Sequence, residues 1–192
     1  MKSIYKRIGH AGVLLIFAFI IGLIFPNLNV NAAGKKKVLI VYFSATGNTK
    51  NVAKNINKAT GETLYQIKAK QPYKAKDIDY NTDNCRANVE QKDDNARPEI
   101  KGKVKNIRKY DVIFIGYPIW WGKEPKIVKT FLESYNLKGK KIVPFCTSGG
   151  SGISGSLKGI KESAKGAKVL SGKDLTDSSY KSIKKWAKKK IK

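Results

Sequence analysis

The sequence is poor in histidine and cysteine. Its single histidine, His10, lies close to the N-terminus, so the rest of the chain cannot build a Ser-His or Cys-His nucleophilic site, and the common imidazole metal sites are excluded. Two cysteines, Cys85 and Cys146, are too few for a disulfide-built scaffold, and the sequence leaves open whether they pair. We therefore predict no catalytic side chain and no metal ion. If the protein is an enzyme, we expect a bound cofactor to carry the chemistry.

Acidic residues are also scarce. The chain has 39 lysines and arginines against 14 aspartates and glutamates, which gives a formal net charge of +25. Such a balance bears on association and solubility rather than on the fold. The basic residues are almost all lysine and are spread along the chain, which is typical of a solvated surface. No nucleic-acid recognition motif is present, so binding to nucleic acid is not favoured.

Residues 1–33 have the pattern of an export signal. A positively charged start is followed by an apolar run at residues 11–25 and by small residues suited to cleavage at 30–33. The apolar run has about fifteen residues, whereas a membrane-spanning helix needs roughly 20. An uncleaved N-terminal anchor is the alternative. In both cases we expect residues 34–192 to form one domain outside the cytoplasmic membrane.

Strand-like and helix-like patterns alternate through this domain. Residues 38–43 form a continuous apolar run, which is typical of a strand buried on both faces of a parallel sheet. The alternation, repeated five times, predicts an α/β fold with a five-stranded parallel sheet and helices on both faces. The expected strands are 38–43, 63–67, 112–117, 141–146 and 168–170, and the expected helices are 48–58, 102–109, 125–135, 156–165 and 176–191. The long polar stretch 70–98 is expected to be an ordered lid.

A polar turn follows the first expected strand and opens the first expected helix. Four of its side chains can form hydrogen bonds (Ser44, Thr46, Asn48 and Thr49), and Gly47 permits close backbone approach. The free N–H groups and the positive dipole at a helix N-terminus form an anion site. The simpler alternative is an N-cap by Thr46 or Asn48. The Gly-Lys-Ser/Thr ending of a nucleoside-triphosphate loop is missing.

Two further loops suit a flat ligand. Paired tryptophans exposed at the end of a strand are costly unless a ligand or partner covers them, although both could instead pack against the neighbouring helix. The glycine-rich loop after the fourth strand offers bare backbone and N–H donors. The candidate binding residues are Pro118, Ile119, Trp120, Trp121 and Gly122 in the first loop, and Thr147, Ser148, Gly149, Gly150 and Gly152 in the second.

The glycine-rich loop also supports a competing hypothesis. Residues 150–155 satisfy G-x-G-x-x-G, with Asp174 some twenty residues further on, which is typical of a dinucleotide fold. This interpretation explains one loop only. It leaves an NAD(P)-dependent enzyme as an alternative.

The motif Ser-x-Thr-Gly-Asn-Thr directly after the first strand resembles the FMN phosphate loop of the flavodoxins. The resemblance covers residues 37 to about 186 and is looser in the lid, where Tyr80, Arg86, Glu90, Arg97 and Pro98 match one branch of the family. It implies the strand order 2-1-3-4-5 and FMN as cofactor, with the phosphate on Ser44–Thr49 and the ring between the tryptophan and glycine loops. It also implies electron transfer, as a carrier or as a reductase of a quinone or similar acceptor. A cofactor-free extracytoplasmic binding protein on the same scaffold is the non-redox alternative.

Two groups of lysines bear on possible partners. Lys123 and Lys126 follow the tryptophan loop, and we expect their charge to lie near the flavin and to make its potential less negative. The cluster Lys188–Lys190 either solvates the last helix or binds anionic lipid or cell-wall polymer. A redox partner or a small-molecule electron acceptor is expected in addition.

Overall fold

The computed structural model describes residues 36–192, and the expected export signal at 1–33 lies outside the described residues. Five strands form a parallel sheet in the order β2-β1-β5-β6-β7. In chain order these parallel strands are 2-1-3-4-5, so the predicted fold is confirmed. Their bounds are β1 (Val38–Tyr42), β2 (Thr63–Gln66), β5 (Val112–Pro118), β6 (Lys141–Thr147) and β7 (Lys168–Val169).

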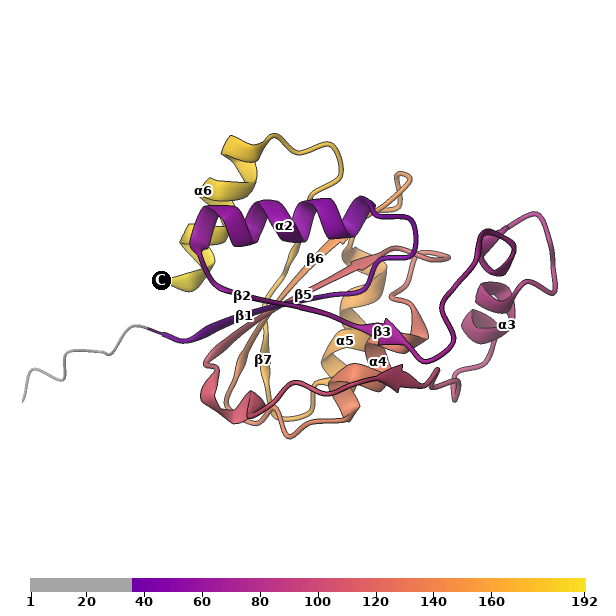
Figure 1. Cartoon of the computed structure of the whole chain (residues 1–192), viewed down its shortest axis with the longest axis horizontal. Helices are drawn as coiled ribbons and strands as arrows, with labels where there is room; N and C mark the ends of the chain where they lie inside the picture. The colour runs from indigo at the N-terminus through magenta and orange to yellow at the C-terminus, as the bar shows by residue number, and fades with distance from the viewer. Residues whose placement is uncertain (1–35) are drawn as a thin grey trace, which may run out of the picture. The chain divides into compact units, whose positions relative to one another are not determined.

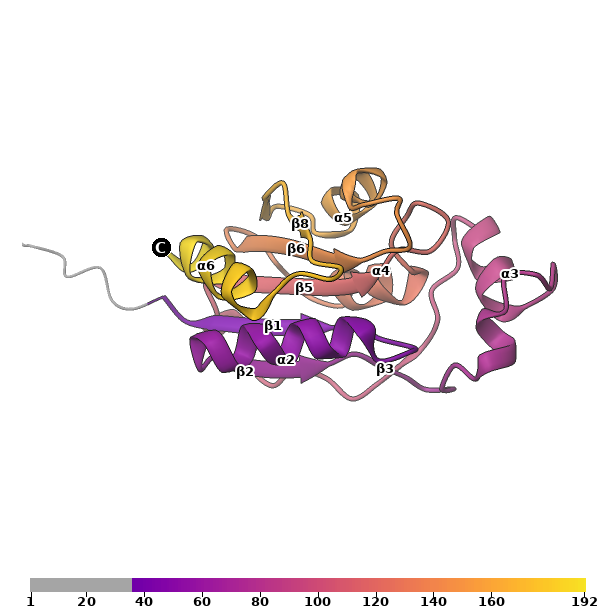
Figure 2. The same cartoon turned by 90° about the horizontal axis from the view of Figure 1, so that it is seen from above.

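Helices cover both faces of this sheet (Figures 1 and 2). On β1, Leu39 and Val41 pack into one core cluster with helices α4 (Lys126–Glu133) and α5 (Leu157–Ser163). The alternate residues of β1 pack into a second cluster with α2 (Asn48–Thr60) and α6 (Tyr180–Ile191). All five β1 residues are buried, because successive side chains of a strand point to opposite faces and helices cover both faces here. The continuous apolar run therefore has the physical cause expected from the sequence.

The last strand is longer than predicted and is interrupted. A second piece, β8 (Lys173–Asp174), also pairs with β6. On this side of β6 the carbonyls of Ile142 and Cys146 accept hydrogen bonds from the N–H groups of Leu170 and Leu175 (2.9 and 3.0 Å). Pro144 lies midway between these two residues of β6, so its backbone faces the same edge strand. Proline has no N–H to donate to a ladder. The edge strand therefore leaves β6 opposite this proline, and three residues separate the end of β7 from the start of β8.

The stretch between β2 and β5 forms an insertion at the carboxyl end of the sheet (Figure 2). A short antiparallel pair, β3 (Lys68–Ala69) and β4 (Ile100–Lys101), closes its base. Between them lie a 3-10 turn, η1 (Ala75–Ile78), and the helix α3 (Arg86–Lys92), whose N-cap is Cys85. The expected lid is thus built from regular elements.

The prediction of a helix at residues 102–109 is wrong. Only its last three residues form a 3-10 turn, η2 (Ile107–Lys109). Gly102 and Asn106 both adopt left-handed backbone conformations, with φ of 82° and 52°, and these interrupt a right-handed helix.

The sequence left open whether the two cysteines pair. Cys85 and Cys146 are buried free thiols, and burial raises the pKa of the Cys146 thiol. Between residues 36 and 192 no cluster of three or more potential ligands could hold a metal ion. No helix in this part of the chain is long and apolar enough to cross a membrane.

Candidate functional site

The loops that follow β1, β5 and β6 meet around one cleft of about 550 Å³. Its volume falls within the range of about 300–1,000 Å³ that is usual for small-molecule and cofactor sites. The carboxyl ends of parallel strands lie at the same edge of a sheet, which is why three distant loops converge here. Eight of the predicted residues line the cleft: Thr46, Asn48, Pro118, Ile119, Trp120, Thr147, Ser148 and Gly149. The other seven predicted binding residues do not line this cleft.

The first turn of α2 has the geometry of an anion site. Its N-cap is Gly47, with φ of 99°, and no side chain caps the helix, so the alternative in which Thr46 or Asn48 is the cap is wrong. Ser44 instead stabilises the turn itself, because its Oγ accepts a hydrogen bond from the Gly47 N–H at 3.1 Å. The N–H groups at the start of α2 are therefore left without a side-chain cap, next to Thr46 and Asn48 in the cleft.

The hydroxyl of Thr49 is committed to the loop after β6. Thr49 is buried, and its Oγ1 lies 2.8 Å from Oγ1 of Thr147. This bond joins the first turn of α2 to the end of β6. Thr49 therefore supports the cleft from behind, while Thr147 lines it.

The two tryptophans have different environments. Trp120 is 3% exposed and packs edge-on against Phe43 and Tyr73, with ring centroids 5.6 and 5.3 Å away. Trp121 is 46% exposed and contacts Tyr80, whose ring centroid lies 4.7 Å away. Trp120 lines the cleft and Trp121 does not, but Tyr80 does. The alternative in which both tryptophans pack against the neighbouring helix is therefore wrong, because Trp121 is exposed and the rings around Trp120 belong to Phe43 and Tyr73, which lie outside the helices.

The tryptophan loop is a two-residue hairpin. The backbones of Trp120 and Lys123 exchange hydrogen bonds of 2.9 and 3.0 Å. The two residues between them, Trp121 and Gly122, have φ of 50° and 72°. Positive φ at both central positions is what a type I′ turn requires. Gly122 therefore shapes the loop rather than the cleft surface.

Ser148 organises the glycine-rich loop. Its Oγ accepts hydrogen bonds from the N–H groups of Gly150 and Gly152 (3.2 and 3.1 Å) and donates to the carboxylate of Asp174 (2.7 Å). Burial would raise the pKa of Asp174, but hydrogen bonds from Thr176, Ser148 and Cys146 lower it overall. Asp174 is thus committed to holding this loop, which weakens the dinucleotide hypothesis because that hypothesis needs this acid for a ribose hydroxyl.

The segment before α6 also lines the cleft, which the sequence did not predict. Residues 175–178 line the cleft together with Asn51, Asn55 and Ile78. The Oγ1 of Thr176 accepts a hydrogen bond from the Ser148 N–H at 2.8 Å. We expected the helix to begin at residue 176, but α6 starts at Tyr180. The available signal was Ser179, whose Oγ caps the helix by accepting from the Ser182 N–H.

Three residues of the lid form a compact ionic group. The hydroxyl of Tyr73 and the Nε of Arg86 both donate to the carboxylate of Glu90, at 2.5 and 2.6 Å. The guanidinium of Arg86 also lies 3.9 Å from the centre of the Tyr73 ring. Burial and the bond to Glu90 raise the pKa of Tyr73. Since Tyr73 in turn packs on Trp120, this group fixes the lid against the tryptophan loop.

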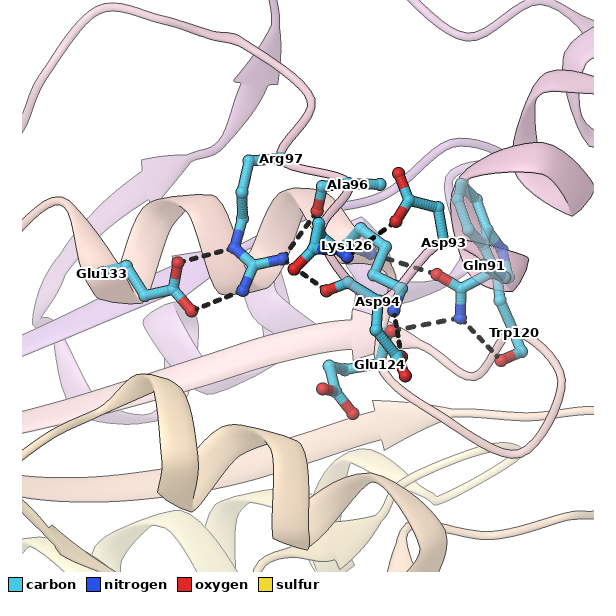
Figure 3. A network of polar contacts seen from close by, with 10 residues as sticks. Gln91, Asp93, Asp94, Ala96, Arg97, Trp120, Glu124, Lys126 and Glu133 are labelled. Carbon is cyan, nitrogen blue, oxygen red and sulfur yellow. Dashed lines mark hydrogen bonds and ion pairs between the residues drawn. The ribbon is translucent and has the colours of Figure 1, made fainter.

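Gln91 joins the lid helix α3 to the tryptophan loop (Figure 3). Its Nε2 donates to the carbonyls of Trp120 and Glu124, both at 3.2 Å, and its Oε1 accepts from the Lys126 N–H at 3.2 Å. One side chain thus binds the backbone at both ends of the hairpin. The shape of this side of the cleft therefore depends on α3.

The lysines expected beside the cofactor lie elsewhere. Lys123 and Lys126 line a separate cavity of about 330 Å³ between α4 and α5. The Lys126 side chain is 4% exposed, and its Nζ pairs with Asp94 at 3.0 Å (Figure 3). In the described chain no lysine or arginine lines the cleft. The geometry gives no support to the expectation that these two lysines shift the flavin potential.

The same cavity contains a buried carboxyl group. Glu124 is 5% exposed, and burial raises its pKa, although Lys129, Lys126 and Lys123 act against this. Its carboxylate lies directly over Gly159, where an added Cβ would come within 1.8 Å of Oε1. Gly159 therefore leaves the space that the carboxylate occupies.

Comparison with known proteins agrees with this fold. The family model described as Flavodoxin matches residues 37–190, so the chain belongs to the flavodoxin family. A solved structure from Bacteroides eggerthii, assigned as a flavoprotein, is 44% identical, with 80% of this chain and 96% of that chain covered and a TM-score of 0.76. A similar one from Bacteroides uniformis is 38% identical, with 80% and 98% covered and a TM-score of 0.76.

A third structure was solved with a ligand. It is a flavoprotein from Lactobacillus acidophilus in complex with FMN, 29% identical, with 72% of this chain and 92% of that chain covered and a TM-score of 0.60. No curated protein matches the chain.

Proposed function

We propose that this protein binds FMN in the cleft and uses it for electron transfer. The observation that carries the proposal is the convergence of a helix N-terminus without a side-chain cap, an aromatic loop and a glycine-rich loop on one cleft. The FMN complex of the Lactobacillus relative supports the same ligand. FMN supplies one-electron and two-electron chemistry when it is bound.

The residues present fit the phosphate group of FMN. The free N–H groups at the start of α2, with the side chains of Thr46 and Asn48, would hold it. No cationic side chain lines the described cleft, so hydrogen bonds and the helix dipole carry the binding. Such a neutral cradle fits a phosphate monoester, and Gly47 keeps the turn open because its φ of 99° is unfavourable for other residues.

The apolar part of the cleft fits the flavin ring. Pro118, Ile119 and Trp120 provide its apolar wall, and Gly149 brings bare backbone to the opposite loop. Ile119 and Trp120 are themselves buried, so this wall is held rigidly by the core behind it. The chain thus contributes binding, orientation and exclusion of water.

Calorimetric titration of the purified full chain tests the binding proposal. We expect FMN to bind at least tenfold more tightly than riboflavin, because only FMN reaches the α2 N-terminus, and we expect NADH not to compete. An Asn48→Ala variant should weaken FMN and leave riboflavin unchanged. Binding of NADH without FMN would support the dinucleotide alternative instead. Binding of neither compound would favour the cofactor-free alternative.

The reaction class needs a separate measurement. As a carrier, the chemically reduced protein should reoxidise rapidly on mixing with an acceptor but show no turnover with NADH or NADPH. As a reductase, it should catalyse steady reduction of a quinone by one of these nucleotides. Absence of both activities in FMN-loaded protein would refute electron transfer while leaving FMN binding intact.

A further inference from the structure

The layer formed by α2 and α6 carries a strongly one-sided charge. The two helices pack against each other on one face of the sheet (Figures 1 and 2). Neither helix contains an aspartate or a glutamate. Eight of their nine lysines are exposed, and we call these eight the lysine face: Lys50, Lys54, Lys58, Lys181, Lys184, Lys185, Lys188 and Lys189.

The opposite layer of helices is electrostatically mixed. It includes Glu133, which pairs with Arg97 at 2.6 Å, and Glu162, which lies 4.0 Å from Lys158. By contrast, none of the ion pairs found between residues 36 and 192 involves the lysine face. Like charges three or four residues apart on a helix destabilise it. The arrangement on α6 therefore favours an anionic partner that supplies the missing counter-charge.

The lysine face is suited to an extended surface rather than to a nucleic-acid strand. Single-stranded nucleic acid needs aromatic side chains on which bases stack. The one large aromatic exposed on α2 and α6 is Tyr180, at 37%, and Lys58 lies over its ring. Trp186 instead packs inward on Phe114 and Phe145. Lysines are compact charges on flexible stems, which suit attraction to a dense layer of anionic headgroups.

The point at which the chain enters the domain adds a geometric argument. The Nζ of Lys36 donates to the carbonyl of Lys192, so the first described residue lies at the C-terminal end of α6. The described chain therefore begins beside the lysine-rich end of this helix, and the apolar run at 11–25 precedes this point in the sequence. A polybasic patch adds to the membrane affinity of a neighbouring apolar or lipid signal, so a lysine-rich surface at this point would strengthen attachment.

We propose that the lysine face binds the anionic headgroups of a lipid bilayer and holds the α2–α6 layer against it. This contact does not use the cofactor cleft, although α2 and α6 also supply Asn51, Asn55 and Ile183 to the cleft wall. The cleft opens at the carboxyl end of the sheet, where the insertion containing α3 also lies (Figure 2). The lysines concerned are not among the residues that line the cleft.

Sedimentation with lipid vesicles tests this proposal on the full chain. Vesicles of phosphatidylcholine, with or without phosphatidylglycerol, separate the charge effect from that of the apolar segment, which is identical in every variant. The face variant carries four substitutions on α6: Lys184→Gln, Lys185→Gln, Lys188→Gln and Lys189→Gln. The control variant has the same net charge and carries Lys68→Gln, Lys101→Gln, Lys103→Gln and Lys105→Gln.

We expect the face variant to lose at least tenfold in partitioning to the anionic vesicles at low salt, and the control variant to lose less than threefold.

Several outcomes would overturn the proposal. Equal losses in the two variants would show that net charge, not this face, drives binding. Unchanged binding in the face variant, or anionic binding that persists at high salt, would assign attachment to the apolar segment alone. If the face variant fails to fold by circular dichroism, the pair Lys188→Gln and Lys189→Gln replaces it, with Lys101→Gln and Lys103→Gln as control. FMN affinity should be unchanged throughout, so failure here leaves the proposed function untouched.

Discussion

Replacing Gln91 by glutamate should weaken FMN binding without touching the cleft itself. The change keeps the shape and the acceptor for the Lys126 N–H but removes the amide donor that serves Trp120 and Glu124. Each lost hydrogen bond contributes about 1 kcal/mol, and the new carboxylate oxygen would repel two carbonyls. Gln91 is partly exposed, so we expect a loss of about 2 kcal/mol in unfolding free energy.

Part of that loss should appear in the cofactor affinity, because the bonds fix the tryptophan hairpin that walls the cleft. We expect FMN to bind about tenfold more weakly, equivalent to about 1.4 kcal/mol. Fluorescence titration of the apoprotein with FMN and urea unfolding measure the two effects. Gln71→Glu is the matched control, since Gln71 is exposed in the same lid and should leave both quantities unchanged.

A dependence on pH distinguishes positioning from general destabilisation. Protonating the introduced carboxyl group at low pH restores one donor, so the affinity of Gln91→Glu should recover toward that of the wild type as the pH falls below 5. If the variant is destabilised but binds FMN as tightly as the wild type, α3 does not shape the cleft and the reasoning is wrong.

Two further predictions concern stability, both measured by urea unfolding. Gly116→Ala should lower the free energy of unfolding by about 2 kcal/mol, because the added Cβ would lie 2.1 Å from the buried Phe145 ring. Gly149→Ala is the control, since its Cβ would meet free space and the stability should hardly change. Equal losses in the two variants would contradict this reasoning. Since burial raises the pKa of Glu124 above its usual 4.5, the stability due to its neutral form is complete below pH 4.5 and is lost as the pH rises through the folded-state value. Glu124→Gln should therefore be more stable than the wild type at pH 7 and equal to it at pH 4, and a less stable variant at pH 7 would refute this.

The parallel sheet could be predicted because its strands are buried on both faces. The run beginning at Val38 has no polar interruption, and its alternate residues enter two separate cores. The turn at Gly47 could be predicted equally well, because small polar residues directly after such a strand indicate a helix N-terminus. These features depend on neighbours in the sequence, and for that reason the pattern alone was informative.

The rest depends on contacts between distant segments. The distinct environments of Trp120 and Trp121 follow from a hairpin held by Gln91, some thirty residues earlier. Lys126 carries the same charge as Lys123, but its pairing with Asp94 becomes visible only when the lid is folded against α4. The split of the last strand could have been inferred from Pro144, had its orientation in β6 been known.

That split also determines how one border of the sheet meets other molecules. A continuous open strand offers a row of free N–H and C=O groups, on which a strand from another chain can add. Here β7 and β8 present two residues each, on either side of the proline. Neither piece is long enough to template a stable intermolecular ladder. The interruption should thus protect the protein against edge-to-edge aggregation at high concentration, on the side of the sheet where Pro144 lies.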